Sequence, residues 1–343
     1  MGKLGYYFRV AKSGLNPKKV IRMVKRTHEY SGKNSVYLFF DMLWCGVRYG
    51  AGWVDYLEFE FYNMNSAQRD SYVTRMRNKK LILKLNDQTV TDVIDNKGEF
   101  RKKFAKYLGR AVVDVKGLSF EDFSAFVADK DSIIAKPYIG ESGKGIEKLN
   151  KADFDSIESF YAYVTAGRFG LIEEIIVQHP DLARVYPHSV NAYRIVTVVG
   201  DDGEVYCVYA TAKFGAGGNF VDNIENGGVF CPIDLETGTI SGCANTSTKT
   251  LTTFDSHPDT GVPFKGYKLP MVREAVDLCR AAALEVSPAI RFIGWDAFIT
   301  EKGVGIIEGN DYPGYDFWQQ PVHTPDKIGL MPFFKKVVPN AFK

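Results

Sequence analysis

Acidic and amide side chains follow one another near the C-terminal end of the sequence. Asp296 lies in one apolar stretch, Glu308 ends the next, and Asn310 follows two residues later. A loop of three residues (301–303) between the stretches predicts that Asp296 lies directly opposite Glu308, about 5 Å away, with Asn310 on the same face. Facing carboxylates repel unless a cation lies between them, and oxygen ligands of this kind suit Mg²⁺. The residues alone fit a metal site no better than two alternatives. In one, the acidic pair lies on a solvated face of the sheet; in the other, the strand register is shifted by one residue.

A lysine and a glycine-rich stretch follow another apolar run. Lys136 ends the run 132–136, and the loop after it contains Gly140, Ser142, Gly143 and Gly145. Backbone N–H groups in such a loop can surround phosphate oxygens, and a lysine adds a point charge. The spacing does not match a P-loop, because Tyr138 and Gly145 occupy positions that would have to match. Taken alone, the glycines fit a hairpin turn better than a phosphate site.

Charged residues also interrupt two later apolar runs. Arg194 lies within 190–199, and Lys213 lies near the end of 204–214. A charge inside a sheet needs either a core carboxylate or a bound anion as its partner, and both remain open. The apolar run 171–177 fits an ordinary buried strand, or a strand that packs against a flat heterocycle.

These residues need sheets to position them, and the chain changes character near residue 81. Before it, the pattern predicts helices that begin at Pro17, at Ser35 and near Asn65. After it, short apolar runs alternate with glycine-centred turns. We expect strands at 112–115, 132–136, 146–149, 171–177, 190–199, 204–214, 293–299 and 304–308, and helices at 97–108, 119–128, 154–163 and 271–284.

Composition and charge exclude several classes of protein. The chain is 45% hydrophobic and 24% charged, as in soluble globular proteins, and its net charge of +2 is too small to indicate a nucleic-acid partner. Five scattered cysteines and a start without a signal-peptide pattern predict a cytoplasmic protein.

Residues 1–33 hold nine Lys or Arg against Glu29. This basic segment could dock on a membrane surface, a lipid-linked saccharide or an acidic polysaccharide, or could simply be a solvated face.

The order of these motifs along the chain resembles that of the ATP-grasp superfamily. Residues 96–320 are most similar to the sugar-transfer-associated ATP-grasp proteins, through LIEEIIVQHP, NAYRIVTV, NFVDNIENGGVFCPIDLETG and GWDAFITEKGVGIIEGNDYPG. The resemblance implies an α+β fold in which two α+β subdomains clasp ATP. We expect a helical, basic region at 1–80 and an ATP-grasp domain at 81–343. Within that domain, about 130–180 would contain the glycine-loop lid, and 185–343 would contain the metal-binding subdomain.

The resemblance also implies the residues of an ATP site. The implied ATP-binding residues are Lys97, Lys136, Gly140, Ser142, Gly143, Gly145, Glu173, Glu174, Ile175, Ile176, Gln178 and Asp181. Two Mg²⁺ ions would bind Asp296, Glu308 and Asn310, while Arg194 and Lys213 would be catalytic. The sequence departs from the usual pattern at two positions: relatives usually have an acid near Gln178, and they often have an arginine in place of Lys213.

The activity implied is Mg-ATP-dependent carboxylate–amine ligation, which proceeds through an acyl phosphate and releases ADP. The substrates would be a small carboxylate and an amine, one of them sugar-containing, lipid-linked or an amino acid, in surface polysaccharide or glycoconjugate synthesis. Residues suited to contact a sugar or amino acid are Asp222, Asn223, Asn226, Tyr312 and Tyr315. The two tyrosines could equally anchor a loop. The alternatives are an ATP-grasp kinase that phosphorylates a hydroxyl and a nucleotide-binding protein without chemistry.

Overall fold

The computed structural model describes residues 17–139, 145–218, 227–245 and 252–342. The chain forms two compact units. Unit 1 combines Met1–Lys84 with Gly314–Lys343, and unit 2 is Leu85–Pro313. The units therefore differ from the expected division at residue 80, because the last thirty residues group with the N-terminal helices rather than with the rest of the expected ATP-grasp domain. No helix in the described ranges is long and apolar enough to cross a membrane.

Unit 1 is helical. Asn34 starts its second helix by accepting hydrogen bonds from the backbone N–H groups of Val36 and Tyr37, and Gly50 ends that helix in the left-handed conformation. The C-terminal segment is tied in by Gln319, whose side chain bonds both backbone groups of Val73 at 2.9 Å. The helices of unit 1 are α2 (Pro17–Ser31), α3 (Ser35–Tyr49), α4 (Trp53–Glu58), η1 (Phe61–Asn63), α5 (Ser66–Asp70), α6 (Arg75–Leu85), α13 (Met331–Val337) and η5 (Pro339–Phe342).

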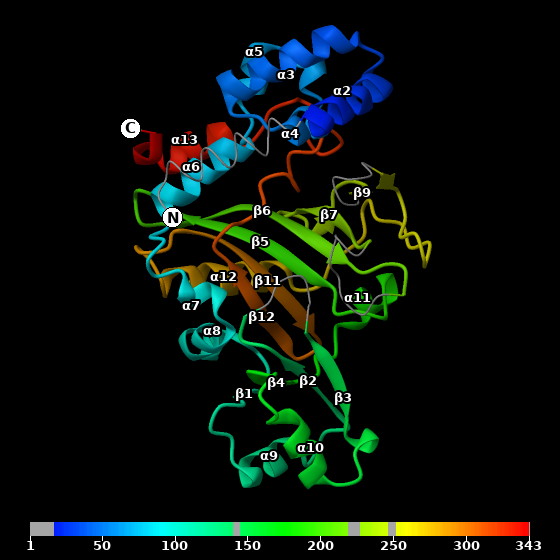
Figure 1. The fold of residues 1–343 in the computed structure, drawn as a ribbon, viewed down its shortest axis with the longest axis vertical. Helices are drawn as coiled ribbons and strands as arrows, with labels where there is room; N and C mark the ends of the chain where they lie inside the picture. The colour runs from blue at the N-terminus through cyan, green and yellow to red at the C-terminus, as the bar shows by residue number, and fades with distance from the viewer. Residues whose placement is uncertain (1–16, 140–144, 219–226, 246–251, 343) are drawn as a thin grey trace. The chain divides into compact units, whose positions relative to one another are not determined.

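A four-stranded antiparallel sheet with the order β1-β4-β2-β3 forms one part of unit 2. Its apolar side chains pack with the helices α9 and α10, whose Phe123 and Phe160 are fully buried. Figure 1 shows these two helices beside the sheet. The elements of this part are β1 (Val112–Asp114), α9 (Phe120–Val127), β2 (Ser132–Lys136), β3 (Glu147–Asn150), η3 (Lys151–Asp153), α10 (Ile157–Val164) and β4 (Leu171–Glu174).

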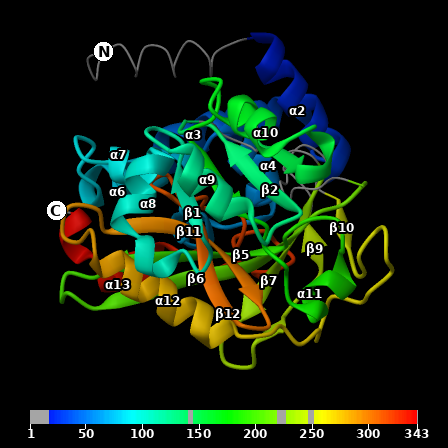
Figure 2. The ribbon, with the colours of Figure 1, turned by 90° about the horizontal axis from the view of Figure 1, so that it is seen from below.

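An eight-stranded antiparallel sheet forms the larger part of unit 2. Its order is β10-β9-β7-β6-β5-β11-β12, with β8 paired to β7. Helix α12 runs along the central strands, as Figure 2 shows, and buries Ala275, Cys279 and Ala282 against them. The remaining elements are α7 (Asp92–Asp95), α8 (Lys97–Lys103), η2 (Ala105–Tyr107), α11 (Pro180–Val185), β5 (Ala192–Val199), β6 (Val205–Phe214), β7 (Val229–Asp234), β8 (Thr239–Ile240), β9 (Ala244–Asn245), β10 (Thr253–Phe254), α12 (Val272–Leu284), β11 (Phe292–Thr300) and β12 (Gly303–Asn310).

Most predicted elements of unit 2 are present, with differences at their ends. The strand at 132–136 has the predicted bounds, whereas the strand expected at 171–177 ends at Glu174 and the helix expected at 97–108 splits into α8 and a short 3₁₀ turn. The predicted change of character near residue 81 was misplaced, because Leu85 is the last residue of α6. Strands β7 to β10 were not predicted, because the polar, glycine-rich sequence around them obscures any alternation of apolar and polar residues.

Candidate active site

Three charged side chains form a row across β5, β11 and β12. Arg194 pairs with Asp296, and Asp296 pairs with Glu308, so each lies directly opposite the next. Directly opposed residues of an antiparallel sheet point to the same face. Gly294 pairs with Asn310, which places Asn310 on that face as well. The predicted pairing of Asp296 with Glu308 is therefore confirmed, and the structure adds Arg194 to the same row.

The predicted loop between β11 and β12 was wrong in length. Thr300 pairs with Gly303, so the turn has two residues and not three. The register near the turn is consequently one residue out of step with the predicted one. A bulge between the pairs of Asp296 and Ala297 inserts Ile307 as an extra residue on β12, and this restores the pairing of the two carboxylates.

Asp296 is held between two cations. Arg194 donates from Nε to Oδ1 at 2.5 Å and from Nη2 to Oδ2 at 3.0 Å, and the Lys213 Nζ lies 3.1 Å from Oδ2. All three side chains are at least 87% buried. Burial by itself raises the pKa of the Asp296 carboxyl, but the charges of Arg194 and Lys213 outweigh it and hold that pKa well below its ordinary value. Asp296 is thus an anion that orients both cations beside the Glu308 strand.

A second ion cluster links the two sheets. On β4, the Glu173 carboxylate contacts the Lys136 Nζ of β2, and it also accepts from Arg110 Nη2 at 2.9 Å. Arg110 in turn donates from Nη1 to the carbonyl of Ile306 on β12, at 2.9 Å. Burial raises the pKa of Glu173, but Arg110 and Lys136 together lower it overall, so the carboxylate stays ionised. Lys136 is therefore fixed at the end of its strand, 7% exposed.

A cavity of about 630 Å³ lies between the four-stranded sheet and the edge strand β12. Its volume falls in the range of small-molecule sites. Residues from helices α7 and α8 close one side of it. Predicted site residues that line the cavity are Lys97, Lys136, Glu173, Glu308, Asn310 and Tyr312. Tyr312 also donates to Gln88 Oε1 at 3.2 Å.

The predicted adenine hinge connects the two sheets of unit 2. The segment after β4 carries Ile175, Ile176 and Gln178, and the backbone N–H of His179 then bonds the carbonyl of Ile299 on β11 at 2.8 Å. Both polar atoms of the Gln178 amide form hydrogen bonds within the protein. Its Nε2 donates to the carbonyls of Tyr186 and Ser189, while Oε1 accepts from Asn191.

The remaining predicted residues are dispersed. The Glu174 carboxylate is exposed and accepts from the backbone N–H of Ala111 at 3.2 Å, and Asp181 lies beside His179 at 3.6 Å. Tyr315 belongs to unit 1, where it donates to Asp55 Oδ1 at 2.7 Å. Gly145 is described and has a positive φ of 76°. Gly140, Ser142, Gly143, Asp222, Asn223 and Asn226 lie outside the described residues.

Two features of this site were not predicted. Arg110 was missed because a lone arginine before a short strand carries no local signal; its role depends on β4 and β12 meeting in space. The Asp95–Asp311 pair was also missed, although both residues line the cavity. Burial and the charge of Asp95 raise the pKa of Asp311 to about 6.

A family model describes this combination of parts. The model for sugar-transfer associated ATP-grasp proteins matches residues 76–325, which is most of the chain. The chain belongs to this sugar-transfer-associated ATP-grasp family. Its fold is accordingly the ATP-grasp fold, here with a helical N-terminal region, as the sequence predicted.

Solved ATP-grasp structures share low identity with this family member. The ATP-grasp ligase PsnB in complex with a minimal precursor is 14% identical, with a TM-score of 0.42 over 72% of this chain and 63% of that one. N5-carboxyaminoimidazole synthetase from Staphylococcus aureus in complex with ADP is 10% identical, with a TM-score of 0.40 over 65% of this chain and 46% of that one. The chain thus spans about half to two thirds of their lengths. No curated protein matches its sequence.

The oxygen donors beside this cavity fit a hard cation. Glu308 and Asn310 offer oxygen atoms to the cavity from one face of β12, and Asp296 stands in the same row. A carboxylate has about four acceptor positions, so the three hydrogen bonds that Asp296 accepts leave it one. Within the described ranges, no three His, Cys, Asp or Glu side chains gather as a metal site, and the expected set contains two carboxylates and one amide.

Proposed function

We propose that this protein is a Mg-ATP-dependent, ADP-forming carboxylate–amine ligase. The carboxylate or the amine would be a small sugar-containing molecule, a lipid-linked saccharide or an amino acid, in the synthesis of surface polysaccharide or another glycoconjugate. We place the reaction in the cytoplasm, the compartment that supplies ATP. Family membership supports ATP-grasp chemistry, and the row of Arg194, Asp296 and Glu308 beside Asn310 is the observation that carries the proposal.

The row supports phosphoryl transfer because it sets cations and oxygen ligands side by side on rigid strands. Bound Mg-ATP, with two Mg²⁺ ions, would supply the transferable γ-phosphoryl group and neutralise its charge. Glu308 and Asn310 would hold the metal, with Asp296 as their third partner. Lys136 and Lys97, which line the cavity, would contact phosphate oxygens.

Arg194 and Lys213 would act at the reacting carboxylate. Asp296 fixes the Arg194 guanidinium through two hydrogen bonds, so the cation needs no reorganisation when negative charge develops near it. Both cations are largely buried, which strengthens their attraction for an oxyanion relative to bulk water. The amine would then attack the carbonyl carbon of the acyl phosphate, the same cations would stabilise the resulting oxyanion, and inorganic phosphate would leave as the amide forms.

The deciding experiment measures ADP release from Mg-ATP with pools of carboxylates and amines. We expect ADP release that requires both a carboxylate and an amine. The mass of the carboxylate should increase by the mass of the amine minus one water, as amide formation requires. The Glu308→Gln variant should lose this activity, whereas Glu301→Gln, which changes an exposed carboxylate in the adjacent turn, should keep it. Release that needs no amine and yields a phosphorylated hydroxyl would instead establish the kinase alternative. A protein that binds Mg-ATP but never turns it over would be a nucleotide-binding protein.

A further inference from the structure

Helix α3 of unit 1 has an apolar face that is exposed to solvent. Five large side chains on it are between 49% and 86% exposed: Val36, Tyr37, Phe40, Trp44 and Val47. At about 100° per residue they fall within an arc of about 100°, so they form one continuous stripe along the helix. Single exposed apolar residues are common on proteins, but a contiguous stripe of this size marks an interaction site.

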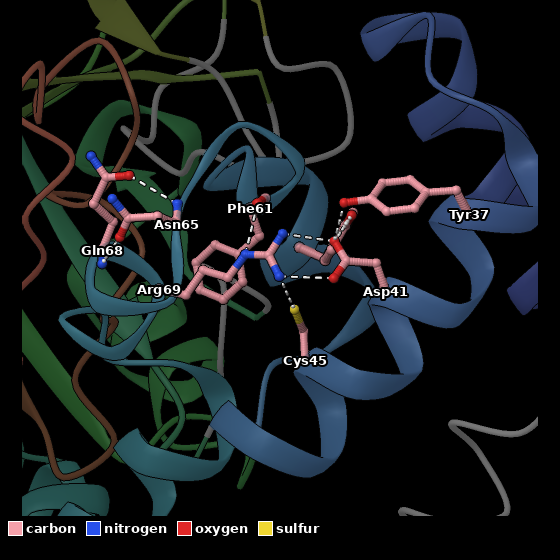
Figure 3. Close-up of polar contacts among 8 residues, drawn as sticks. Tyr37, Asp41, Cys45, Phe61, Asn65, Gln68 and Arg69 are labelled. Atoms are coloured by element: carbon pink, nitrogen blue, oxygen red, sulfur yellow. Dashed lines mark hydrogen bonds and ion pairs between the residues drawn. The ribbon is translucent and has the colours of Figure 1, made fainter.

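Beside the stripe, Asp41 of α3 forms a buried ion pair that fixes this orientation, and it also accepts a hydrogen bond from the Tyr37 hydroxyl at 3.4 Å. Arg69 donates to Asp41 from both terminal nitrogens, at 2.8 and 2.7 Å, and also to the carbonyl of Phe61 at 2.9 Å. The Tyr56 hydroxyl adds a hydrogen bond to Asp41 at 2.6 Å. Figure 3 shows Asp41 and Arg69 pointing toward each other beside Cys45. Rotating α3 to cover its stripe would break this pair, in which both side chains are about nine-tenths buried.

The neighbouring helix α2 is strongly basic. It packs beside α3 within unit 1. Its fifteen residues hold five Lys or Arg against Glu29 as the one acid. Ile21, 67% exposed, adds another apolar side chain to its outer side. Of the basic segment 1–33 expected from the sequence, residues 17–33 are described.

We propose that α2 and α3 form a docking surface for an anionic lipid bilayer. Aromatic residues such as Trp44, Tyr37 and Phe40 are favoured at the headgroup boundary, and basic residues add attraction to anionic lipid. A second copy of the chain fits less well, because it would bring a second basic helix to the same interface. The proposal does not depend on ligase activity, so either can fail without the other.

The test uses the full chain and vesicles of two compositions. We expect co-sedimentation with vesicles of phosphatidylcholine mixed with phosphatidylglycerol, little with phosphatidylcholine alone, and weaker binding at high salt. The chain has four tryptophans, and Trp44 is the one on the stripe. Anionic vesicles should shift the tryptophan emission to shorter wavelength in the wild type. Trp44→Phe should abolish that shift while the variant still sediments.

Paired variants separate the apolar and basic contributions. Phe40→Ser combined with Trp44→Ser should lower the vesicle partition coefficient at least about tenfold. Leu284→Ser, which removes a side chain of similar exposure from unit 2, should leave it unchanged. Arg22→Gln combined with Lys25→Gln should lower the coefficient about 30-fold, since each basic residue near an anionic membrane contributes about 1 kcal/mol. Lys116→Gln with Lys302→Gln, both exposed in unit 2, is the matched control.

Three results would overturn the proposal. One is the absence of binding to either kind of vesicle by the wild type. Another is an emission shift that persists in Trp44→Phe, since some other surface would then enter the membrane. The third is concentration-dependent self-association that the Phe40/Trp44 double variant removes, because the stripe would then bind a second copy of the chain.

Discussion

Asp296 lies directly opposite Glu308, and the two carboxylates face each other only because Ile307 is bulged out of the pairing on β12. Between Ala297 and the turn, the strands pair one residue out of step with this register. Without the bulge, Ile307 would occupy the position opposite Asp296. β-Bulges are common beside functional sites, where they redirect a side chain. Here the bulge aligns Glu308 with the row that contains Arg194.

Glu308→Gln should remove Mg-ATP binding and leave the fold intact. The side chain is half-buried at the cavity wall, so its replacement by an uncharged isostere should cost little stability. We expect the Mg-ATP-dependent rise in melting temperature to disappear and any ADP release to fall by at least about 100-fold. Thermal shift with and without Mg²⁺ measures the first effect. A normal Mg-ATP response in this variant would remove Glu308 from the metal site.

Asp296→Asn should instead destabilise unit 2. The substitution leaves Arg194 and Lys213 as two buried cations without their shared anion. Breaking a buried pair of this kind costs about 3–5 kcal/mol in the free energy of unfolding. Urea denaturation measures this cost, and Asp277→Asn, an exposed carboxylate on α12, should change stability by no more than about 0.5 kcal/mol. Equal stabilities would show that the cations have other partners.

Gln178→Glu distinguishes a ribose contact from a structural amide. The Gln178 Nε2 donates to the carbonyls of Tyr186 and Ser189, and a carboxylate at this position would face both carbonyls without a proton. We expect a loss of about 1–3 kcal/mol of stability and no gain in nucleotide affinity. Calorimetric titration with Mg-ATP checks the second point. Tighter binding by the glutamate variant would support the ribose role that the family resemblance implies.

Arg110→Gln should loosen the connection between the two sheets of unit 2. The variant loses the hydrogen bonds to Glu173 and to the carbonyl of Ile306, and it leaves Glu173 with Lys136 alone. We expect a stability loss of about 2–4 kcal/mol and weaker Mg-ATP binding, because Glu173, which positions Lys136, would lose its second cation. Arg273→Gln, on the exposed side of α12, is the control. Unchanged amide hydrogen exchange in β4 and β12 would contradict this role.

Asp316 should make the stability of unit 1 dependent on pH. Burial and the nearby Asp55 charge raise its pKa from 3.8 to about 6, so the folded state favours the protonated form. The stabilisation from this proton is complete below about pH 3.8 and is lost as the pH rises through about 6. Asp316→Asn should therefore raise the free energy of unfolding by about 1–3 kcal/mol at about pH 8 and leave it unchanged at about pH 3.5.

The control for this pH dependence is Asp129, a carboxyl group whose pKa is shifted in the opposite direction. The pKa of Asp129 is lowered, chiefly by its hydrogen bond to Lys130, so Asp129→Asn should give no gain at alkaline pH. Denaturant titrations at several pH values compare the two variants. A gain in Asp316→Asn that is the same at every pH would show that the carboxylate charge is not its cause.

The sequence predicted the parts of the site that depend on local alternation. Asp296 and Glu308 stand out because carboxylates interrupt two adjacent apolar strands, and the hairpin connects those strands directly. The turn length was wrong, and the bulge compensated for the error. Arg110 could not be found in this way, because its partners Glu173 and Ile306 are 63 and 196 residues away in the chain. Such a contact becomes visible only when the two sheets are placed together.

The division into units was unpredictable for a similar reason. Residues 314–343 read as a continuation of the metal-binding subdomain, since aromatic residues follow Asn310 without a break. Their assignment to unit 1 depends on long-range hydrogen bonds such as Tyr72 to Thr324, at 2.9 Å. Tyr315, expected either to contact a substrate or to anchor a loop, donates a hydrogen bond to Asp55 within unit 1.

The split composition of unit 1 affects how the protein can fold during synthesis. Val73 is translated long before Gln319, whose side chain bonds both of its backbone groups. Unit 2 is continuous from Leu85 to Pro313, so it can fold on the ribosome as soon as β12 has emerged. The helices before residue 85 must wait for the C-terminal segment with part of their apolar surface uncovered. Premature termination after Pro313 would therefore leave unit 1 incomplete and exposed to chaperones and proteases.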